Sequence, residues 1–388
     1  MRIVHIADLH LGKTLFDIPL IEDQRLWLCA LTQFLKEQQA DALVIAGDVY
    51  QRTVPSAEAV TLLDDFLNEV VRKLRIPVFM IAGNHDSGER LGFASRLFEE
   101  SGLHVSGNVQ KQLKTITLQD AYGVVNFVLL PYFEPYPIKK LYDDENIKTM
   151  NDAFMRICGE SIEPILDASA PDTRNVLVAH GFFGLDSSLA CFSDSERSVG
   201  GSDMIDYTLL KRFDYVALGH LHAPQTAGAP HIRYAGSPLK YSLSEATQQK
   251  SVTMVELLEK GNVTITKHVL FASHDLRILT GTIEELITQA PKGKTANDYV
   301  YAVLTDKGEV YNAMEKLRAV YPNILGLKRA SSDVEVSVVS AGLELNKKTP
   351  DELFGAFYQE LLGEPITPER EALMHEVLQE AQREESLL

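Results

Sequence analysis

Five short apolar runs in this chain end in Asp, Asn or His, and this feature limits most strongly how the chain can fold. The runs RIVHIA, ALVIA, PVFMIA, NVLVA and YVAL are followed by DLH, GD, GNHD, HG and GHLH. Short apolar runs of this kind are typical of buried strands. Because ligands bind where the carboxyl ends of strands meet in an α/β sheet, the pattern predicts that these polar residues gather at one edge.

The first hundred residues alternate predicted strands with predicted helices. In chain order these are Arg2–Ala7, Asp23–Gln38, Ala42–Ala46, Ser56–Leu74, Pro77–Ala82 and Leu91–Ser101. Ser56 is the expected N-cap of its helix. The β-α-β-α-β order predicts an α/β domain.

The middle of the chain is richer in strands, and a second unit is predicted to begin near Ala272. Predicted strands lie at Gln112–Leu118, Val124–Leu130, Asn175–Ala179, Tyr215–Leu218, Ile232–Ala235 and Ser251–Leu258, with a helix around Lys148–Leu166. The second unit is predicted to be small and α+β, with a strand from Ile278, helices at Thr282–Gln289 and Val310–Val320, and strands at Tyr299–Leu304, Ile324–Leu327 and Val334–Val339. We therefore expect three parts, at residues 1–271, 272–342 and 343–388.

The last part is acidic and predicted to be helical. Glu352–Leu362 carries a broad apolar stripe, and a second helix is expected at Glu369–Glu384. Such a stripe either packs in a core or binds a partner, and its place after a polar segment favours a partner.

Composition places the chain among soluble globular proteins. Of its 388 residues 45% are hydrophobic, and no apolar run approaches the roughly 18 residues that span a bilayer. The three cysteines are far apart and form no CxxC pair, which argues against a thiolate zinc site and favours the cytoplasm. The net charge of −17 argues against strong DNA binding by this chain alone. Bound metal ions, an acidic tail away from the site or a basic partner would offset it.

The residues after the five strands form a candidate metal-binding set. It contains two carboxylates, one amide and four imidazoles: Asp8, Asp48, Asn84, His10, His180, His220 and His222. Residues two apart in an extended chain point the same way, so we expect Asp8 and His10 to reach one point, and likewise His220 and His222. One histidine at a strand end is more often structural, but five strands that all end in this way indicate a shared site. The donors suffice for two ions with one Asp shared, and they suit Mn, Fe or Zn better than Mg.

The series DLH, GD, GNHD, HG and GHLH resembles the calcineurin-like metallophosphoesterase superfamily. Within it, SDSER with VGG, YAGSPLKYS and the tail that begins DELFGAFYQELLGEP resemble the SbcD nuclease subunits. The resemblance implies an α/β fold, namely the metallophosphoesterase αββα sandwich, with a small α+β capping domain and a helical C-terminal tail.

The resemblance also implies roles for the set. One ion, most simply Mn²⁺, would be held by Asp8, His10, Asp48 and His222, and a second by Asp48, Asn84, His180 and His220. Asp48 would bridge them. His85 would face the phosphate, where an imidazole can protonate the leaving oxygen; the alternative is that His85 only orients a metal ligand.

Four further residues near these motifs are candidates for supporting roles. In phosphatases of the superfamily the GD motif continues as GDxxD, but here Gln51 occupies that place, which leaves open what orients the imidazole of His85. Asp86 is expected to cap the next turn. Arg90 and Arg197 are candidates for phosphate contacts, although exposed arginines are common.

The implied function is a manganese-dependent nuclease of DNA repair, recombination and replication, an exonuclease on duplex DNA and an endonuclease on single strands and hairpins. The chain lacks GxxxxGK[ST], so ATP would be used by the implied partner, an SbcC-type coiled-coil ATPase. The family also implies a homodimer within a heterotetramer. The alternatives are a small-molecule phosphodiesterase or phosphatase, which would not need the second unit, and a scaffold without activity, which would not need the complete donor set.

Overall fold

The computed structural model describes residues 1–184, 204–270, 272–291, 293–308, 310–330 and 370. Contacts divide the chain into Met1–Arg329 and Ala330–Leu388. Within the described ranges, no helix has the length and the apolar character that crossing a membrane would require.

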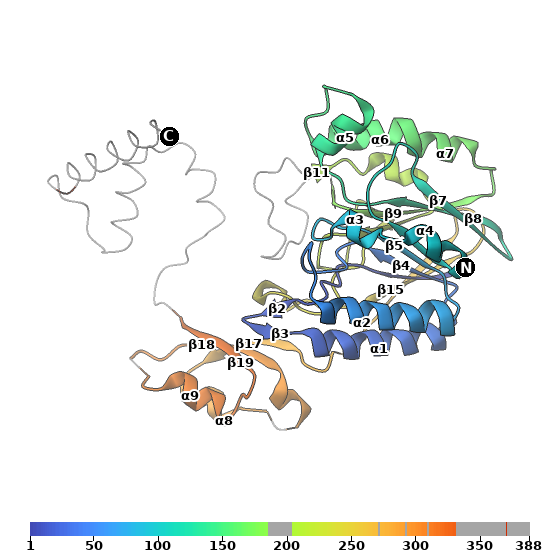
Figure 1. Cartoon of the computed structure of the whole chain (residues 1–388). Coiled ribbons are helices and arrows are strands. Elements are labelled where there is room, and N and C mark those ends of the chain that lie inside the picture. The colour runs from blue at the N-terminus through green and yellow to red at the C-terminus, as the bar shows by residue number, and fades with distance from the viewer. Residues whose placement is uncertain (185–203, 271, 292, 309, 331–369, 371–388) are drawn as a thin grey trace. The chain divides into compact units, whose positions relative to one another are not determined.

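Two mixed sheets form the centre of the first unit (Figure 1). The first has the order β16 (Val263–His268), β15 (Val252–Leu257), β1 (Arg2–Ile6), β4 (Ala42–Ala46), β5 (Val78–Ile81) and β6 (Leu103–Ser106). The second has the order β13 (Gln225–Ala227), β14 (Ala229–Tyr234), β12 (Tyr215–Gly219), β9 (Arg174–His180), β8 (Gly123–Leu130) and β7 (Lys114–Asp120). Within each sheet the central strands are parallel, β1-β4-β5 in one and β8-β9-β12 in the other. Short pairs β2 (Thr14–Leu15) with β3 (Ile18–Pro19) and β10 (Phe182–Phe183) with β11 (Met204–Ile205) lie outside them.

Helices cover the outer face of each sheet, so the layers follow the order α-β-β-α. On the first sheet these are α1 (Ile21–Glu37) and α2 (Ala57–Leu67), the latter continued by a π-helical turn at Asn68–Lys73. On the second they are α5 (Pro135–Tyr142), α6 (Met150–Ile157) and α7 (Glu163–Ala168). The αββα sandwich expected from the resemblance is therefore confirmed.

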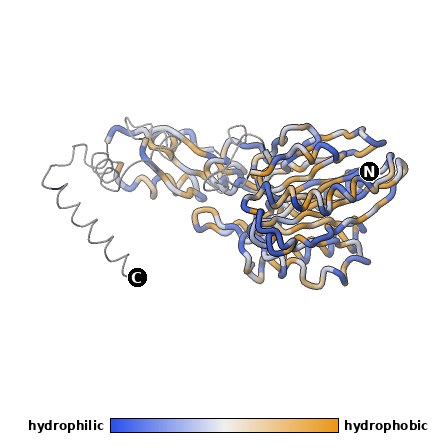
Figure 2. Tube along the Cα trace, turned by 90° about the horizontal axis from the view of Figure 1, so that it is seen from above, coloured by the Kyte–Doolittle hydropathy of each residue, from blue (hydrophilic) through white to orange (hydrophobic). Residues whose placement is uncertain are grey.

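Alternation along the strands explains the layering. In β4, Leu43 and Ile45 are buried with the helices, while Val44 is buried between the sheets. There Phe79 stacks on Phe127 with ring centroids 4.0 Å apart. Figure 2 shows the resulting apolar stretches along the strands, coloured orange.

Most predicted elements are present, but Leu91–Ser101 is not one helix. The structure has α3 (Gly88–Leu91), α4 (Ser95–Phe98) and a 3₁₀ turn at Glu99–Ser101. Ala94 interrupts them with a φ of 58°, a left-handed conformation that ends a right-handed helix. The predicted helix at Ser56–Leu74 does begin as expected, because the Ser56 side chain accepts a hydrogen bond from the Ala59 backbone N–H.

The small second part contains three parallel strands in the order β17 (Leu276–Gly281), β18 (Tyr299–Leu304) and β19 (Ile324–Arg329). Helices α8 (Ile283–Thr288) and α9 (Ala313–Arg318) connect them and share a separate apolar core. Asp23 of α1 joins this part to the sandwich, because its carboxylate accepts hydrogen bonds from the Tyr299 hydroxyl (2.6 Å), from His274 Nδ1 (2.6 Å) and from Ser273. The strand predicted at Val334–Val339 and both helices predicted in the tail lie outside the described residues.

Candidate metal centre

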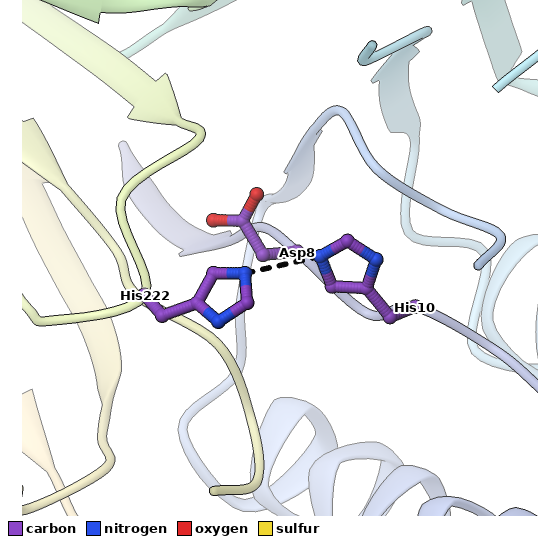
Figure 3. Close-up of side chains that lie close together, drawn as sticks. All are labelled: Asp8, His10 and His222. Atoms are coloured by element: carbon purple, nitrogen blue, oxygen red, sulfur yellow. Dashed lines mark hydrogen bonds between the residues drawn. The ribbon is translucent and has the colours of Figure 1, made fainter. Parts of the chain in front are cut away.

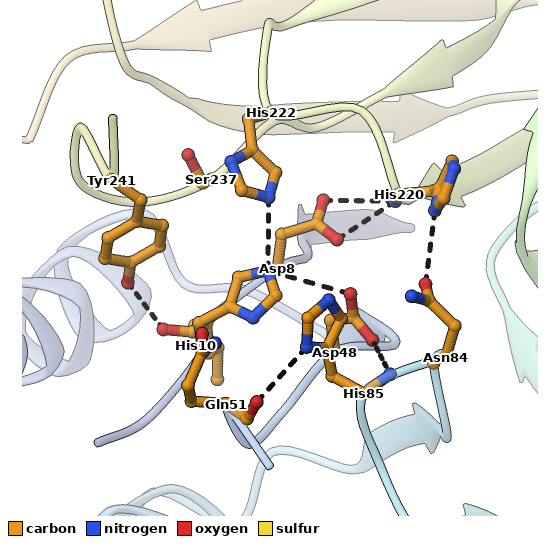
Figure 4. A network of polar contacts seen from close by, with 12 residues as sticks. Asp8, His10, Asp48, Gln51, Asn84, His85, His220, His222, Ser237 and Tyr241 are labelled. Carbon is orange, nitrogen blue, oxygen red and sulfur yellow. Dashed lines mark hydrogen bonds and ion pairs between the residues drawn. The ribbon is translucent and has the colours of Figure 1, made fainter. Parts of the chain in front are cut away.

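The polar residues after five strands meet at the carboxyl edge shared by the two sheets. Figure 4 shows those that follow β1, β4, β5 and β12. Asp8, Asp48 and Asn84 follow β1, β4 and β5 of the first sheet. His180 ends β9, and His220 with its neighbour His222 follows β12, in the second sheet. The Nδ1–H of His180 donates to the backbone carbonyl of Ala46 at 2.8 Å and so joins the two sheets directly beneath the site.

The backbone at this edge has a conformation that is rare for residues with a side chain. Four of the candidate residues have positive φ: Asp8 (54°), His10 (44°), Asp48 (48°) and His220 (115°). Such conformations cost about 1–3 kcal/mol each and persist where the surrounding structure enforces them, as functional sites do. We expected Asp8 and His10 to point the same way because their backbone is extended, and that reason is wrong, since β1 ends at Ile6.

Two glycines allow the strands to approach one another this closely. A Cβ on Gly47 would lie 2.3 Å from His180 Nδ1, and one on Gly83 would lie 2.2 Å from Asp48 Oδ1. Any larger residue at either place would push a candidate ligand out of position.

The first group of candidate ligands is Asp8, His10 and His222, which Figure 3 shows close together, with a ring nitrogen of His10 turned toward one of His222. Their ligand atoms lie within 4.8 Å of one another, and each residue is at most 2% exposed. The Nε2 atoms of His10 and His222 are 3.1 Å apart. Asp8 also accepts from the backbone N–H of His220 at 3.0 Å, so its carboxylate is held in place.

The second group surrounds Asp48 and Asn84. Asp48 Oδ2 lies 3.6 Å from His10 Nε2 and 3.6 Å from His180 Nε2, so its carboxylate stands between the two groups. The amide oxygen of Asn84 lies 3.0 Å from His180 Nε2 and 3.2 Å from His220 Nδ1. All seven predicted donors are thus brought together at one edge.

Burial sets the protonation of the imidazoles. It lowers the pKa of His10 and of His180, and it lowers the pKa of His220 to about 3. These rings are therefore neutral at neutral pH, which is the form that binds a metal ion. Converging carboxylates and neutral imidazoles, with two nitrogen atoms facing each other, fit a divalent cation.

His85 lies beside this cluster, and its ring is perpendicular to that of His10 with centroids 4.8 Å apart. Its Nδ1 is 3.1 Å from the backbone carbonyl of Gln51. Because a carbonyl only accepts, Nδ1 carries the proton and Nε2 is left for the site. The backbone carbonyl of Gln51, and not the side chain at that position, therefore makes the contact that orients the imidazole of His85.

Asp86 does not cap the following turn, as the sequence led us to expect; Ser87 does, accepting from the Arg90 N–H. The buried carboxylate of Asp86 instead accepts from the backbone N–H groups of Val49, Tyr50 and Gly83, at 3.0, 2.8 and 2.9 Å. Burial and the charge of Asp48 raise the pKa of Asp86. Asp86 thereby fastens the loop that carries Asp48 to the loop that carries Asn84 and His85.

Two further residues that the sequence did not single out hold the DLH loop. Gln24 of α1 donates to the carbonyls of Leu9 (3.1 Å) and His10 (2.8 Å), and the Tyr241 hydroxyl donates to Leu9 O at 2.5 Å. Of the motifs in the sequence, YAGSPLKYS is the one that contains Tyr241. Arg90 lies on α3 next to the His85 loop, while Arg197 lies outside the described residues.

Comparison with known proteins extends over nearly the whole chain. The model of the calcineurin-like phosphoesterase family matches residues 1–224, and that of the type 5 capsule protein repressor C-terminal domain matches residues 272–361. The chain is 32% identical over 369 residues to the SbcD subunit of the SbcCD nuclease from Staphylococcus epidermidis, covering 95% of both chains. It is 30% identical over 378 residues to the protein of the same name from Staphylococcus saprophyticus subsp. saprophyticus, covering 97% of this chain and 98% of that one.

Similarity to solved structures is weaker. A dimetal phosphatase from Danio rerio is 13% identical over 69% of this chain and 96% of its own, with a TM-score of 0.42.

Proposed function

This chain belongs to the calcineurin-like phosphoesterase family, and from that premise we propose that it is the nuclease subunit of a DNA repair and recombination complex. The convergence of seven carboxylate, amide and imidazole donors at one sheet edge is the observation that carries the proposal. Near-full-length similarity to two proteins named as SbcD subunits of the SbcCD nuclease supports DNA as the substrate. The reaction is hydrolysis of phosphodiester bonds, in duplex ends by exonuclease action and in single strands or hairpins by endonuclease action.

The site would hold two divalent ions, for which Mn²⁺ is our proposal because nitrogen and oxygen donors are mixed. Asp8, His10, Asp48 and His222 would hold one ion, and Asp48, Asn84, His180 and His220 would hold the other. The position of Asp48 between the two groups supports its role as the bridge. When bound, such ions activate water and neutralise charge on the phosphate.

The protein itself supplies orientation and a proton. His85 holds its Nδ1 proton toward the Gln51 carbonyl, so that Nε2 faces the phosphate. When the ring is charged, Nε2 protonates the leaving oxygen, and a positioned group of this kind contributes about 10²–10⁴-fold. Asp86 keeps His85 and Asp48 in register by fastening their loops together.

We propose that the chain divides its tasks among residues 1–271, which form the nuclease domain, 272–342, which form the capping domain, and 343–388, which form a helical tail for partner binding. The partner would be an SbcC-type coiled-coil ATPase in the cytoplasm. That partner would also supply the basic surface that a chain of net charge −17 lacks.

A homodimer within a heterotetramer completes the proposal. Its support is an apolar groove of about 730 Å³ beside α2, α3 and α4. Large apolar side chains are exposed there, with Phe93 80% and Phe98 45% accessible. Exposed apolar surface of this kind marks interaction sites.

Cleavage of end-labelled hairpin DNA with Mn²⁺, comparing the wild type with His85→Ala, tests the function. We expect the wild type to cut and the variant to lose about 100-fold or more of the rate, while both bind manganese equally. Manganese binding without cleavage of DNA, but with cleavage of a small phosphodiester such as bis-p-nitrophenyl phosphate, would favour the alternative of a small-molecule phosphodiesterase. A wild type that binds no manganese would contradict the proposal.

A further inference from the structure

A buried charged network lies behind His222, on the side away from the site. Glu245, which is 0% exposed, places Oε1 3.1 Å from His222 Nδ1. Its other oxygen, Oε2, accepts from the Lys250 ammonium at 2.6 Å and from the Tyr241 backbone N–H at 3.2 Å. Lys250 is itself 9% exposed. Burying two charges is costly unless they are paired and hydrogen-bonded, and here both conditions are met.

The ammonium group of Lys250 is also fixed by several hydrogen bonds. Lys250 also donates to the backbone carbonyl of His222 at 2.9 Å and to Ser237 Oγ at 2.8 Å. Ser237 in turn donates from its backbone N–H to the same carbonyl at 3.1 Å. Both the ring and the backbone of His222 are therefore tied to one network, which surrounds it on the face opposite His10.

The direction of the hydrogen bond from His222 decides what the ring offers to the site. An ionised carboxylate only accepts, so the proton of a neutral His222 lies on Nδ1. The lone pair is then on Nε2, the atom that lies 3.1 Å from His10 Nε2. His180 is held in the same way by the Ala46 carbonyl, whereas His222 has a charged partner.

We propose that Glu245, held by Lys250, is a positioning residue that fixes His222 in the tautomer and orientation needed to bind a metal ion. The inference rests on the proposed metal site and assigns to this pair a role that the sequence motifs did not indicate. Partners of this kind typically contribute 10–100-fold to metal affinity.

Glu245→Gln is the informative change. The ammonium and the Tyr241 N–H both require an acceptor at the Oε2 position, so the amide oxygen will turn toward them. The amide NH₂ then faces His222 Nδ1 and forces the ring proton onto Nε2, where it blocks the metal. Asp214→Asn is the matched control, because Asp214 also pairs with a lysine (Lys260, 2.8 Å) and its side chain is 5% exposed, but it precedes the opposite end of β12.

Mn²⁺ titration of the full chain by calorimetry, together with melting of the metal-free protein, tests the proposal. We expect Glu245→Gln to weaken one of the two manganese-binding events by about 10–100-fold. Asp214→Asn should lower the melting temperature and leave the affinities of both binding events unchanged. Equal manganese affinities in the wild type and Glu245→Gln would overturn the role of Glu245 and leave the metal site standing. A wild type that binds no manganese would overturn both.

A second measurement needs no folded Glu245 variant. Imidazole ¹⁵N spectra of the metal-free wild type, with His222 assigned by its loss in His222→Asn, report which ring nitrogen carries the proton. A proton on Nδ1 is the expected result, and a proton on Nε2 would overturn the proposal.

Discussion

Removal of the Asp86 carboxylate should destabilise the protein more than the loss of any exposed acid. Asp86 is 8% exposed and is the acceptor for three backbone N–H groups, those of Val49, Tyr50 and Gly83. In Asp86→Ala these donors lose their acceptor inside the protein. A buried donor left without a partner costs about 1–3 kcal/mol. Water satisfies some of the donors, and loss of the carboxylate also relieves its burial and its repulsion by Asp48, which raise the pKa of Asp86; the expected net loss is therefore about 3–5 kcal/mol rather than the full sum for three donors.

Asp86→Asn is a milder substitution at the same position and should destabilise the protein less than Asp86→Ala. Val49 N and Gly83 N both contact Oδ2, while Tyr50 N contacts Oδ1. An amide oxygen at the Oδ2 position would keep two of the three hydrogen bonds, and its NH₂ group would then face the Tyr50 N–H. We expect a loss of about 1–3 kcal/mol, smaller than that of the alanine variant.

Urea unfolding of the metal-free wild type and both variants, followed by circular dichroism at pH 7, measures these losses. The midpoint should shift while the slope stays the same, because the change affects stability and not the surface exposed. Free energies of unfolding within about 1 kcal/mol of the wild type for Asp86→Ala would refute the reasoning, since each contact is expected to contribute at least that much.

Three further predictions concern the site and its support. Gln51→Ala should keep DNA cleavage close to the wild-type rate, because the backbone carbonyl orients His85; a loss as large as that of His85→Ala would show that the side chain is needed. Gly83→Ala should weaken manganese binding by roughly tenfold or more in calorimetry, since its Cβ would lie 2.2 Å from Asp48 Oδ1; unchanged affinity would contradict that crowding. Burial lowers the pKa of His5 to about 3, so its contribution to stability is complete above pH 6.5 and falls by about 1.4 kcal/mol per pH unit below it. His5→Phe should therefore flatten the dependence of unfolding free energy on pH between 6 and 4, and an unchanged slope would exclude His5 as a source.

The fold and the donor set could be predicted because they leave local signals. The apolar runs before Asp8, Asp48 and His180 are short enough to be strands, and each ends in a residue that a strand interior rarely holds. Because carboxyl ends of parallel strands share an edge, their convergence follows without knowledge of the loops. The conformation of the loops does not follow, and the positive φ of Asp8 and His220 has no local sequence sign.

The supporting residues could not be predicted, because their partners come from distant parts of the chain. Glu245 stands in the polar stretch SLSEATQQK, which looks solvent-exposed until His222 and Lys250 enclose it. At position 51 the sequence shows only the side chain, whereas the contact to His85 is made by the backbone.

The prediction of one helix at Leu91–Ser101 is wrong for a related reason. Its apolar residues have helical spacing, but Phe93 and Leu97 are 80% and 79% exposed. Periodicity reports which residues avoid water, and these residues are not covered by the part of the chain that the structure describes. A continuous helix would therefore gain no buried apolar contact at this place within the described residues. The chain can break between α3 and α4, where Ala94 has a left-handed backbone conformation.

Anomalous diffraction at the manganese edge, from crystals of the wild-type chain soaked in Mn²⁺, tests the two-ion site most directly. Two peaks should lie at the carboxyl edge of β1, β4, β5, β9 and β12, with Asp48 in contact with both. A single peak, or peaks away from Asp48, would contradict the account.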